Sequence, residues 1–296
     1  MSDLKVRLFG YIEVNYGEDI LLGPKAKALF AYLLLNRNQF HAREQLANLF
    51  WGDRSEKQAR RCLNTTLWRL RNKLDTALHK SEDYLLTGSR GEISFNLASD
   101  YWLDIAEFNQ HLQQLLHLAP NQLSPSQVTE IENAIQLYRG DLMEGFYNEW
   151  VVQEREKQRA IFIKSLLHLL AYYHHHQNYE KSIPYGKHLL TLEPLREDIH
   201  RDLMQQYYES GQIQNVYLQY EKCRQILREE LGVIPTDETR RLFDQLIQSP
   251  ILPKEGPLAH HQELAIMSQQ INSLKDEIIK LQQTMAMLIS GQKELF

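Results

Sequence analysis

The chain has 296 residues and favours two folded units, because single domains usually span about 100 to 200 residues. Its composition, 43% hydrophobic and 24% charged, is that of a globular protein, and no stretch approaches the roughly 18 apolar residues that cross a bilayer. The N-terminus lacks the continuous apolar stretch of a signal peptide, so we expect a cytoplasmic protein without a membrane span.

The net charge of −5 is unevenly distributed along the chain. Residues 1–98 carry 15 Lys and Arg against 11 Asp and Glu, a net charge of +4, which leaves −9 for the remainder. This asymmetry is expected where only the N-terminal part meets a polyanion.

The first elements predicted are a small sheet and two helices. Residues 4–14 and 20–22 have the alternation and β-branched content of short strands, with a turn between them. A largely buried helix is predicted over 24–35, beginning at a proline, and a shorter helix over 43–50.

A third helix is predicted from Ser55 to about Leu74. Ser55 can cap it, and Gln58 stands at the capping-box position. Five apolar residues recur at spacings of four, four, three and four: Ala59, Leu63, Leu67, Leu70 and Leu74. At 100° per residue they share one face, which predicts that this face is buried.

The opposite face of this helix carries the residue types that bind DNA. A major groove admits one α-helix, whose exposed side chains must reach phosphates and base edges. The candidates for groove contacts are Arg61, Asn64, Thr65, Trp68 and Arg69, and those for phosphate contacts are Lys57, Arg71 and Lys73. Asparagine suits bidentate hydrogen bonds with adenine, and arginine with guanine. The alternative is a solvated charged face, against which the exposed position of Trp68 argues.

A β-hairpin is predicted after the third helix. Residues 84–87 and 92–97 read as strands on either side of a turn at 88–91. Arg90 in this turn is placed to reach a neighbouring minor groove or the DNA backbone. Strand, three helices and a wing together predict a winged helix-turn-helix domain over residues 1–98.

Residues 99–248 predict an α-helical repeat domain. The pattern is helical from Tyr101 to about Gln248 without a competing strand signal, and one helix starts at 124–127. Small or apolar residues recur at an offset of 34: Leu170 and Met204, Tyr173 and Tyr207, Tyr179 and Ile213, Ser182 and Val216, Gly186 and Tyr220, Leu189 and Cys223. This period is typical of tetratricopeptide helix pairs.

A coiled coil is predicted at the C-terminus. Residues 249–261 contain proline and glycine and read as a linker, and 262–292 carry heptads. One heptad position holds Leu264, Ile271, Ile278 and Met285, and the position three residues later holds Met267, Leu274, Leu281 and Leu288. This choice of side chains favours a parallel two-stranded coil, so we expect a homodimer. The coil could instead dock a separate partner.

No enzymatic or metal-dependent function is indicated. The run 174–176 of histidines has no neighbouring cysteine or completing carboxylates, and the two cysteines, Cys62 and Cys223, are interpreted as reduced packing residues. The tyrosine-rich segments could line a ligand groove, but tyrosines at helical spacing are more often packing residues. Phosphate-loop and nucleophile motifs are absent. We therefore expect no metal ion, no cofactor and no catalysis.

Several longer stretches are familiar as a set. They are Lys25–Leu35, Arg43–Leu46, Leu49–Gly52, Leu67–Arg71, Leu137–Leu142, Glu149–Trp150, Glu154–Arg155 and Glu229–Pro235. Over about residues 4–248 the chain resembles the SARP-type transcriptional activators, which join an OmpR-like winged helix to a bacterial transcriptional activator domain. The resemblance implies binding to promoter direct repeats as a dimer and recruitment of RNA polymerase.

Two features depart from the family pattern. The wing reads Gly91-Glu92-Ile93 where many members have Gly-Tyr, and the chain continues into the heptads where large members continue into an ATPase and sensor modules.

Our leading hypothesis is a sequence-specific activator that binds double-stranded DNA. The alternative is a tetratricopeptide adaptor that binds a peptide in its groove and does not bind DNA.

Overall fold

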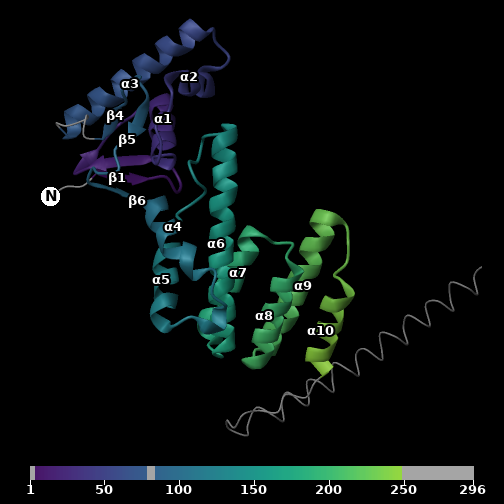
Figure 1. Cartoon of the computed structure of the whole chain (residues 1–296). Coiled ribbons are helices and arrows are strands. Elements are labelled where there is room, and N and C mark those ends of the chain that lie inside the picture. The colour runs from purple at the N-terminus through teal and green to yellow at the C-terminus, as the bar shows by residue number, and fades with distance from the viewer. Residues whose placement is uncertain (1–3, 79–83, 249–296) are drawn as a thin grey trace, which may run out of the picture. The chain divides into compact units, whose positions relative to one another are not determined.

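The structure is a computed structural model, and it describes residues 4–78 and 84–248 (Figure 1). The N-terminal elements are β1 (Leu4–Arg7), β2 (Glu13–Tyr16), β3 (Glu18–Asp19), α1 (Pro24–Leu35), α2 (Arg43–Trp51), α3 (Glu56–Leu78), β4 (Leu85–Thr87), β5 (Ile93–Phe95) and β6 (Tyr101–Leu103). The following helices are α4 (Asp104–Leu115), a 3-10 turn (Pro120–Gln122), α5 (Pro125–Ile135), α6 (Glu149–His175), α7 (Tyr179–Leu192), α8 (Glu197–Glu209), α9 (Ile213–Leu231) and α10 (Asp237–Gln248).

The predicted fold class, mainly helical with an N-terminal winged helix-turn-helix and a helical repeat region, is confirmed. The linker and coiled coil predicted over 249–292 lie outside the described residues.

The strands form two small sheets. One has the order β3-β2-β1-β6, in which β1 is antiparallel to β2 and parallel to β6, with Val6 opposite Leu103. The other is the β4-β5 hairpin, as predicted.

Two expectations about the strands were wrong. Residues 20–22 are not a strand, because the chain turns back earlier, at Gly17 (φ +74°), and pairs Tyr16 with Glu18. Residues 101–103 were expected to be helical, but they form β6. They fill the free edge of β1 and bury Leu103, a long-range pairing that a local pattern does not carry.

The apolar stripe of α3 is buried as predicted. The exposed fractions of its five members, Ala59, Leu63, Leu67, Leu70 and Leu74, lie between 0% and 2%. They pack toward α1 and α2, and α3 continues about one turn beyond the expected end, to Leu78. The opposite face of α3 is thereby turned to solvent.

The carboxylate of Asp104 joins the sheet to the helical region. Asp104 is the first residue of α4, directly after β6, and only 2% of its surface is exposed. Its oxygens accept hydrogen bonds from the backbone N–H groups of Leu8 (2.9 Å), Phe9 (3.0 Å) and Ile105 (2.7 Å). Burial raises the pKa of Asp104, and these three amide bonds oppose the rise. A carboxylate here also suits the positive end of the helix dipole.

A second set of backbone bonds holds the same segment from the other side. The N–H of Gly10 donates to Asp141 O (3.0 Å), and the N–H of Met143 donates to Leu8 O (2.8 Å). The guanidinium of Arg155, on α6, donates to the carbonyls of residues 142, 143 and 146 at 2.9–3.0 Å. The loop before α6 is therefore fixed both to the end of β1 and to α6 itself.

Trp150, in the first turn of α6, packs against aromatic side chains of the first two helices. Its ring centroid lies 5.2 Å from that of Tyr32 on α1 and 6.1 Å from that of Phe50 on α2, both edge to face. Aromatic pairs in this geometry contribute roughly 0.5–1.5 kcal/mol beyond area burial. This contact connects α6 to the helix that precedes α3.

The helices from the C-terminal half of α6 to α9 follow the 34-residue period. The helices α7 and α9 begin at Tyr179 and Ile213, which were predicted to be equivalent. Gly186 allows α8 to approach α7, because a Cβ there would lie 2.7 Å from Cδ2 of Leu203. Gly186, one of the recurring small residues, thus lies at the contact between α7 and α8.

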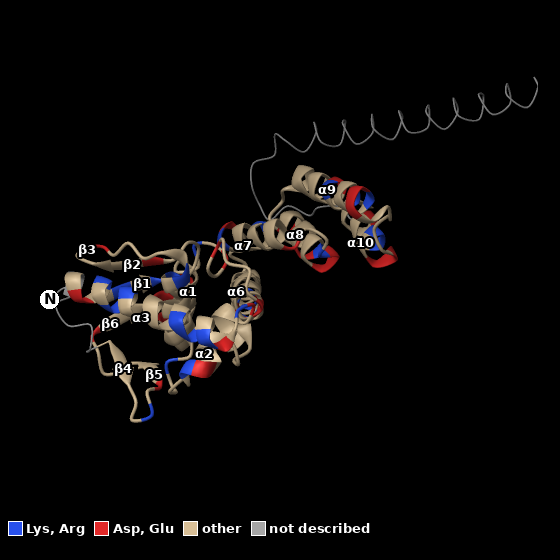
Figure 2. Cartoon of the chain, turned by 90° about the horizontal axis from the view of Figure 1, so that it is seen from above, with Lys and Arg blue, Asp and Glu red and all other residues tan. Residues whose placement is uncertain are grey.

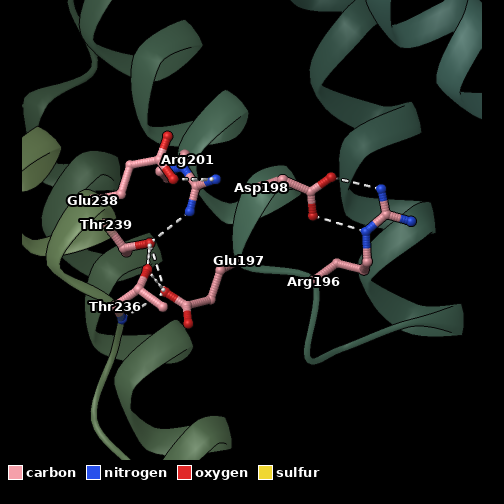
Figure 3. Close-up of polar contacts among 7 residues, drawn as sticks. All are labelled: Arg196, Glu197, Asp198, Arg201, Thr236, Glu238 and Thr239. Carbon is pink, nitrogen blue, oxygen red and sulfur yellow. Dashed lines mark hydrogen bonds and ion pairs between the residues drawn. The ribbon is translucent and has the colours of Figure 1, made fainter.

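The turn between α9 and α10 is a Schellman motif followed by a polar cluster. Gly232 has a φ of +69°, and the N–H groups of Gly232 and Val233 donate to the carbonyls of Arg228 and Leu227. Glu197 Oε2, at the start of α8, accepts hydrogen bonds from Thr236 N (2.9 Å), Thr236 Oγ1 (2.8 Å) and Thr239 Oγ1 (2.6 Å) (Figure 3).

One arginine completes this cluster, and a second forms a separate ion pair beside it. Arg201 donates to Thr239 Oγ1 (2.9 Å) and pairs with Glu238 (3.1 Å), and Arg196 forms a two-bond pair with Asp198 (Figure 3). Burial alone would raise the pKa of Glu197, but the threonine bonds and the charge of Arg201 hold it below its usual value. The cluster attaches the start of α10 to the start of α8.

We expect Asp104→Ala to lower the free energy of unfolding by at least about 2 kcal/mol, because it removes the acceptor of the three buried amides of Leu8, Phe9 and Ile105. Urea unfolding followed by far-UV circular dichroism measures the change. Asp104→Asn retains one acceptor oxygen and should fall between wild type and Asp104→Ala. The exposed Asp100→Ala is the control, and an equal loss in both alanine variants would contradict the role of Asp104.

Acidification should weaken the α8–α10 attachment. A folded-state pKa below the ordinary 4.5 of glutamate means that ionised Glu197 stabilises the fold above pH 4.5. This contribution is lost as the pH falls through the lowered folded-state pKa. The difference in unfolding free energy between wild type and Glu197→Gln should therefore shrink on acidification, measured by denaturant unfolding across a pH series. Parallel profiles for the two proteins would exclude this role; the exposed Glu180→Gln is the control.

Candidate nucleic-acid interface

The exposed face of α3 presents the residues predicted to contact DNA. Lys57, Arg61, Asn64, Thr65, Trp68, Arg69 and Lys73 are all exposed. Trp68 has 63% of its surface exposed, which is unusual for a large aromatic side chain. Lys and Arg recur along α3 in Figure 2. The two faces of the helix are therefore separated as the sequence predicted.

The basic side chains on this face differ in how they are held. Arg60 pairs with Glu44 (3.3 Å) and Glu56 (2.7 Å), so it neutralises the carboxylates near the start of α3. Within the described part of the chain, Arg61 and Arg69 form no ion pair. Exposed, unpaired guanidinium groups are available to phosphates or guanine edges.

Arg71, predicted to contact phosphate, lies instead against the wing. It is half-buried, and its Nη2 donates to Thr87 Oγ1 (2.8 Å) at the end of β4, while its buried Nε has no hydrogen-bond partner among the described residues. This contact fixes the hairpin relative to α3. A phosphate contact by Arg71 remains a prediction.

Arg90 lies exposed in the turn of the hairpin, as expected. The turn is closed by hydrogen bonds from Gly88 N to Glu92 O (2.8 Å) and from Gly91 N to Gly88 O (3.0 Å). Gly91 has a φ of +84°, a conformation that favours glycine. A basic residue marks the tip of the hairpin in Figure 2.

Sequence reasoning missed Arg43, the first residue of α2. Its Nε donates to Gly91 O (2.7 Å) in the wing turn, and its Nη1 donates to Asn64 Oδ1 (2.7 Å) on α3. One side chain therefore connects α2, α3 and the wing. The available signal was a cation in the first turn of a helix, where the dipole disfavours positive charge unless a tertiary contact compensates.

Arg43 and Arg71 lie close enough to affect each other electrostatically. Burial lowers the pKa of Arg43, and the nearby charge of Arg71 lowers it further, while Glu44 acts in the opposite direction. Like charges held close together raise the local positive potential. The fold thus concentrates positive charge where α2, α3 and the wing meet.

The other sequence features have structural explanations. His174 Nε2 lies 3.0 Å from Glu209 Oε2 and His176 Nδ1 lies 2.9 Å from Tyr172 O, and the described residues contain no cluster of three or more potential metal ligands. Tyrosines pack against neighbouring rings, as half-buried Tyr220 does on Phe243 with 4.0 Å between ring centroids. None of the helices in the described ranges is long and apolar enough to cross a membrane.

Comparison with known families assigns both parts of the chain. Residues 17–91 match the family "Transcriptional regulatory protein, C terminal", and residues 103–247 match the "Bacterial transcriptional activator domain". These are families of transcriptional regulators and not of enzymes.

Two transcriptional regulators match most of the length of this chain. The transcriptional regulatory protein MoaR1 of Mycobacterium tuberculosis is 25% identical over 256 residues, covering 83% of this chain and 79% of the relative. The regulatory protein AfsR of Streptomyces griseus is 24% identical over 267 residues, 83% of this chain but only 25% of the much longer relative.

A solved structure has the same fold. Mycobacterium tuberculosis EmbR, in complex with a low-affinity phosphopeptide, superposes with a TM-score of 0.65 and 18% identity, covering 93% of this chain and 72% of that one. A winged helix with an exposed basic recognition face, followed by a bacterial transcriptional activator domain, places this protein in the SARP-type family of transcriptional regulators.

Proposed function

We propose that the protein is a sequence-specific DNA-binding activator. The observation that supports this most directly is the division of α3 into a leucine face with at most 2% exposure and a solvent face of arginine, asparagine, threonine and tryptophan. In this proposal α3 enters the major groove, and Arg90 reaches an adjacent minor groove or the backbone.

The two regions of the chain have different roles in this proposal. We assign DNA binding to residues 1–98 and contacts with RNA polymerase to residues 99–248. The regulatory role named for MoaR1 and AfsR supports this assignment. Because its target is the chromosome, the protein would act in the cytoplasm, without a metal ion or cofactor.

The second candidate is a tetratricopeptide adaptor that does not bind DNA. Stacked helix pairs from α6 to α9 would suit such a role. However, an adaptor gains nothing from unpaired arginines and an exposed tryptophan on α3, while a groove-binding helix needs them. The α3 surface therefore favours DNA.

Removing two cations from α3 should abolish specific binding. We expect Arg61→Ala combined with Arg69→Ala to eliminate the shifted band formed with DNA from upstream of the protein's own gene. The dependence of log affinity on log salt should also flatten by about 0.9 for each phosphate that the variant no longer neutralises. The measurement is a gel shift over a salt series.

The matched control removes two arginines elsewhere. Arg224→Ala with Arg228→Ala, exposed on α9, changes the net charge equally and should leave the shift intact. Failure of the wild-type protein to bind any DNA, even at low salt, would refute the proposed function and leave the adaptor as the better account.

We further propose that the heptads over 262–292 pair two copies of the chain. Deletion of residues 260–296 should lower the mass in sedimentation equilibrium from that of a dimer to that of a monomer. Ile278→Lys, which places a charge in the expected seam, should act in the same direction. Gln283→Lys, at an outward heptad position, is the control, and an unchanged mass after deletion would exclude pairing through this segment.

A further inference from the structure

The contact between Arg43 and Asn64 determines which side of the Asn64 amide faces solvent. Arg43 Nη1 lies 2.7 Å from Asn64 Oδ1. A guanidinium has five donors and no acceptor, so only the carbonyl oxygen of the amide can lie against it. The opposite orientation would place an NH₂ group against a cation. The bond is charge-assisted and therefore among the stronger hydrogen bonds of a protein surface.

Asn64 is consequently held with its oxygen toward α2 and its NH₂ group directed elsewhere. Asn64 itself is exposed on the outer face of α3, next to Thr65 and one turn from Trp68. A free asparagine in a groove can offer both a donor and an acceptor, which is why it pairs with adenine. Here Arg43 takes one lone pair of that oxygen and holds it toward α2, so the NH₂ group is the part of the amide left to meet a base.

We propose that Asn64 acts as a hydrogen-bond donor held in place by Arg43, and that it selects guanine or thymine over adenine or cytosine at one base pair. Guanine (N7 and O6) and thymine (O4) present only acceptors as polar groups in the major groove, whereas cytosine presents an amino donor and adenine an amino donor beside its N7 acceptor. This inference rests on the proposed function, and it replaces the bidentate adenine contact expected from the residue type alone.

Arg43 also connects Asn64 to the wing. Its Nε donates to Gly91 O (2.7 Å), in the turn that carries Arg90. The planar fork of one guanidinium thus sets the positions of Asn64 and of the wing turn together, without an ordering step when DNA binds. Arg43 is in this account a positioning residue, and Asn64 is the residue that contacts the base.

The test replaces the donor by an acceptor while keeping the bond to Arg43. Asn64→Asp retains an oxygen against the guanidinium and turns the second carboxylate oxygen outward. Binding of wild type and variant is compared on a bound promoter sequence in which each base pair is changed in turn to the other three. At one position, the wild-type preference for guanine or thymine should change to cytosine or adenine, with a discrimination of about tenfold.

A second variant tests the positioning role. Arg43→Lys keeps the positive charge but lacks the fork, so the salt dependence of binding should match wild type. Discrimination should fall at the base pair affected by Asn64→Ala, in addition to any loss of affinity that follows from releasing the wing turn. A loss of affinity over all sequences with unchanged discrimination at that base pair would overturn the positioning role of Arg43.

The remaining outcomes are also decisive. A wild-type preference for adenine at the base pair affected by Asn64→Ala would overturn the inference. An Asn64→Asp variant that loses affinity equally for all four bases at this position would overturn it as well. Circular dichroism of each variant shows whether the fold is kept. These results presuppose DNA binding by the wild-type protein, so failure of the proposed function is seen separately, as no binding before any variant is compared.

Discussion

The path of the chain depends on how the end of β1 satisfies its backbone amides. Leu8 and Phe9 follow directly after β1 and are buried, and a buried amide without a hydrogen-bond partner costs about 1–3 kcal/mol. Asp104 supplies both acceptors because β6 lies beside β1 and leads directly into α4. The pairing of β1 with β6, almost a hundred residues later in the chain, therefore also places the start of the helical region.

Tertiary contacts also arrange the exposed surface formed by α2, α3 and the wing. The buried leucines of α3 hold the helix on α1 and α2, and this leaves its cationic face to solvent. Arg71 and Arg43 then fix the wing, through Thr87 and Gly91 respectively. Some cations on this surface thus hold the wing in position, and others, such as Arg61 and Arg69, remain available to an anion. Charge alone does not distinguish the two roles, whereas partners and burial do.

Much of this could be predicted from the sequence, wherever the signal is local. The five-residue stripe of α3 and the proline-led starts of α1 and α5 depend on periodicity or capping within one element. The 34-residue offset between Tyr179 and Ile213 depends on the repetition of one such pattern in two helices. The strand at 101–103 was missed because β6 has only three residues and exists through its pairing with β1. Arg43 was missed because its acceptors lie 21 and 48 residues away in the chain.

The sequence by itself determined the order of the elements, the two faces of α3 and the family to which the chain belongs. Side-chain periodicity and capping chemistry operate over a few residues, and a linear pattern records them fully. Only the tertiary structure decided which cations are occupied and how the Asn64 amide is oriented, because hydrogen bonds between α2, α3 and the wing depend on distances that no spacing encodes. The same residue type can read a base or support a turn, and its neighbours in space determine which.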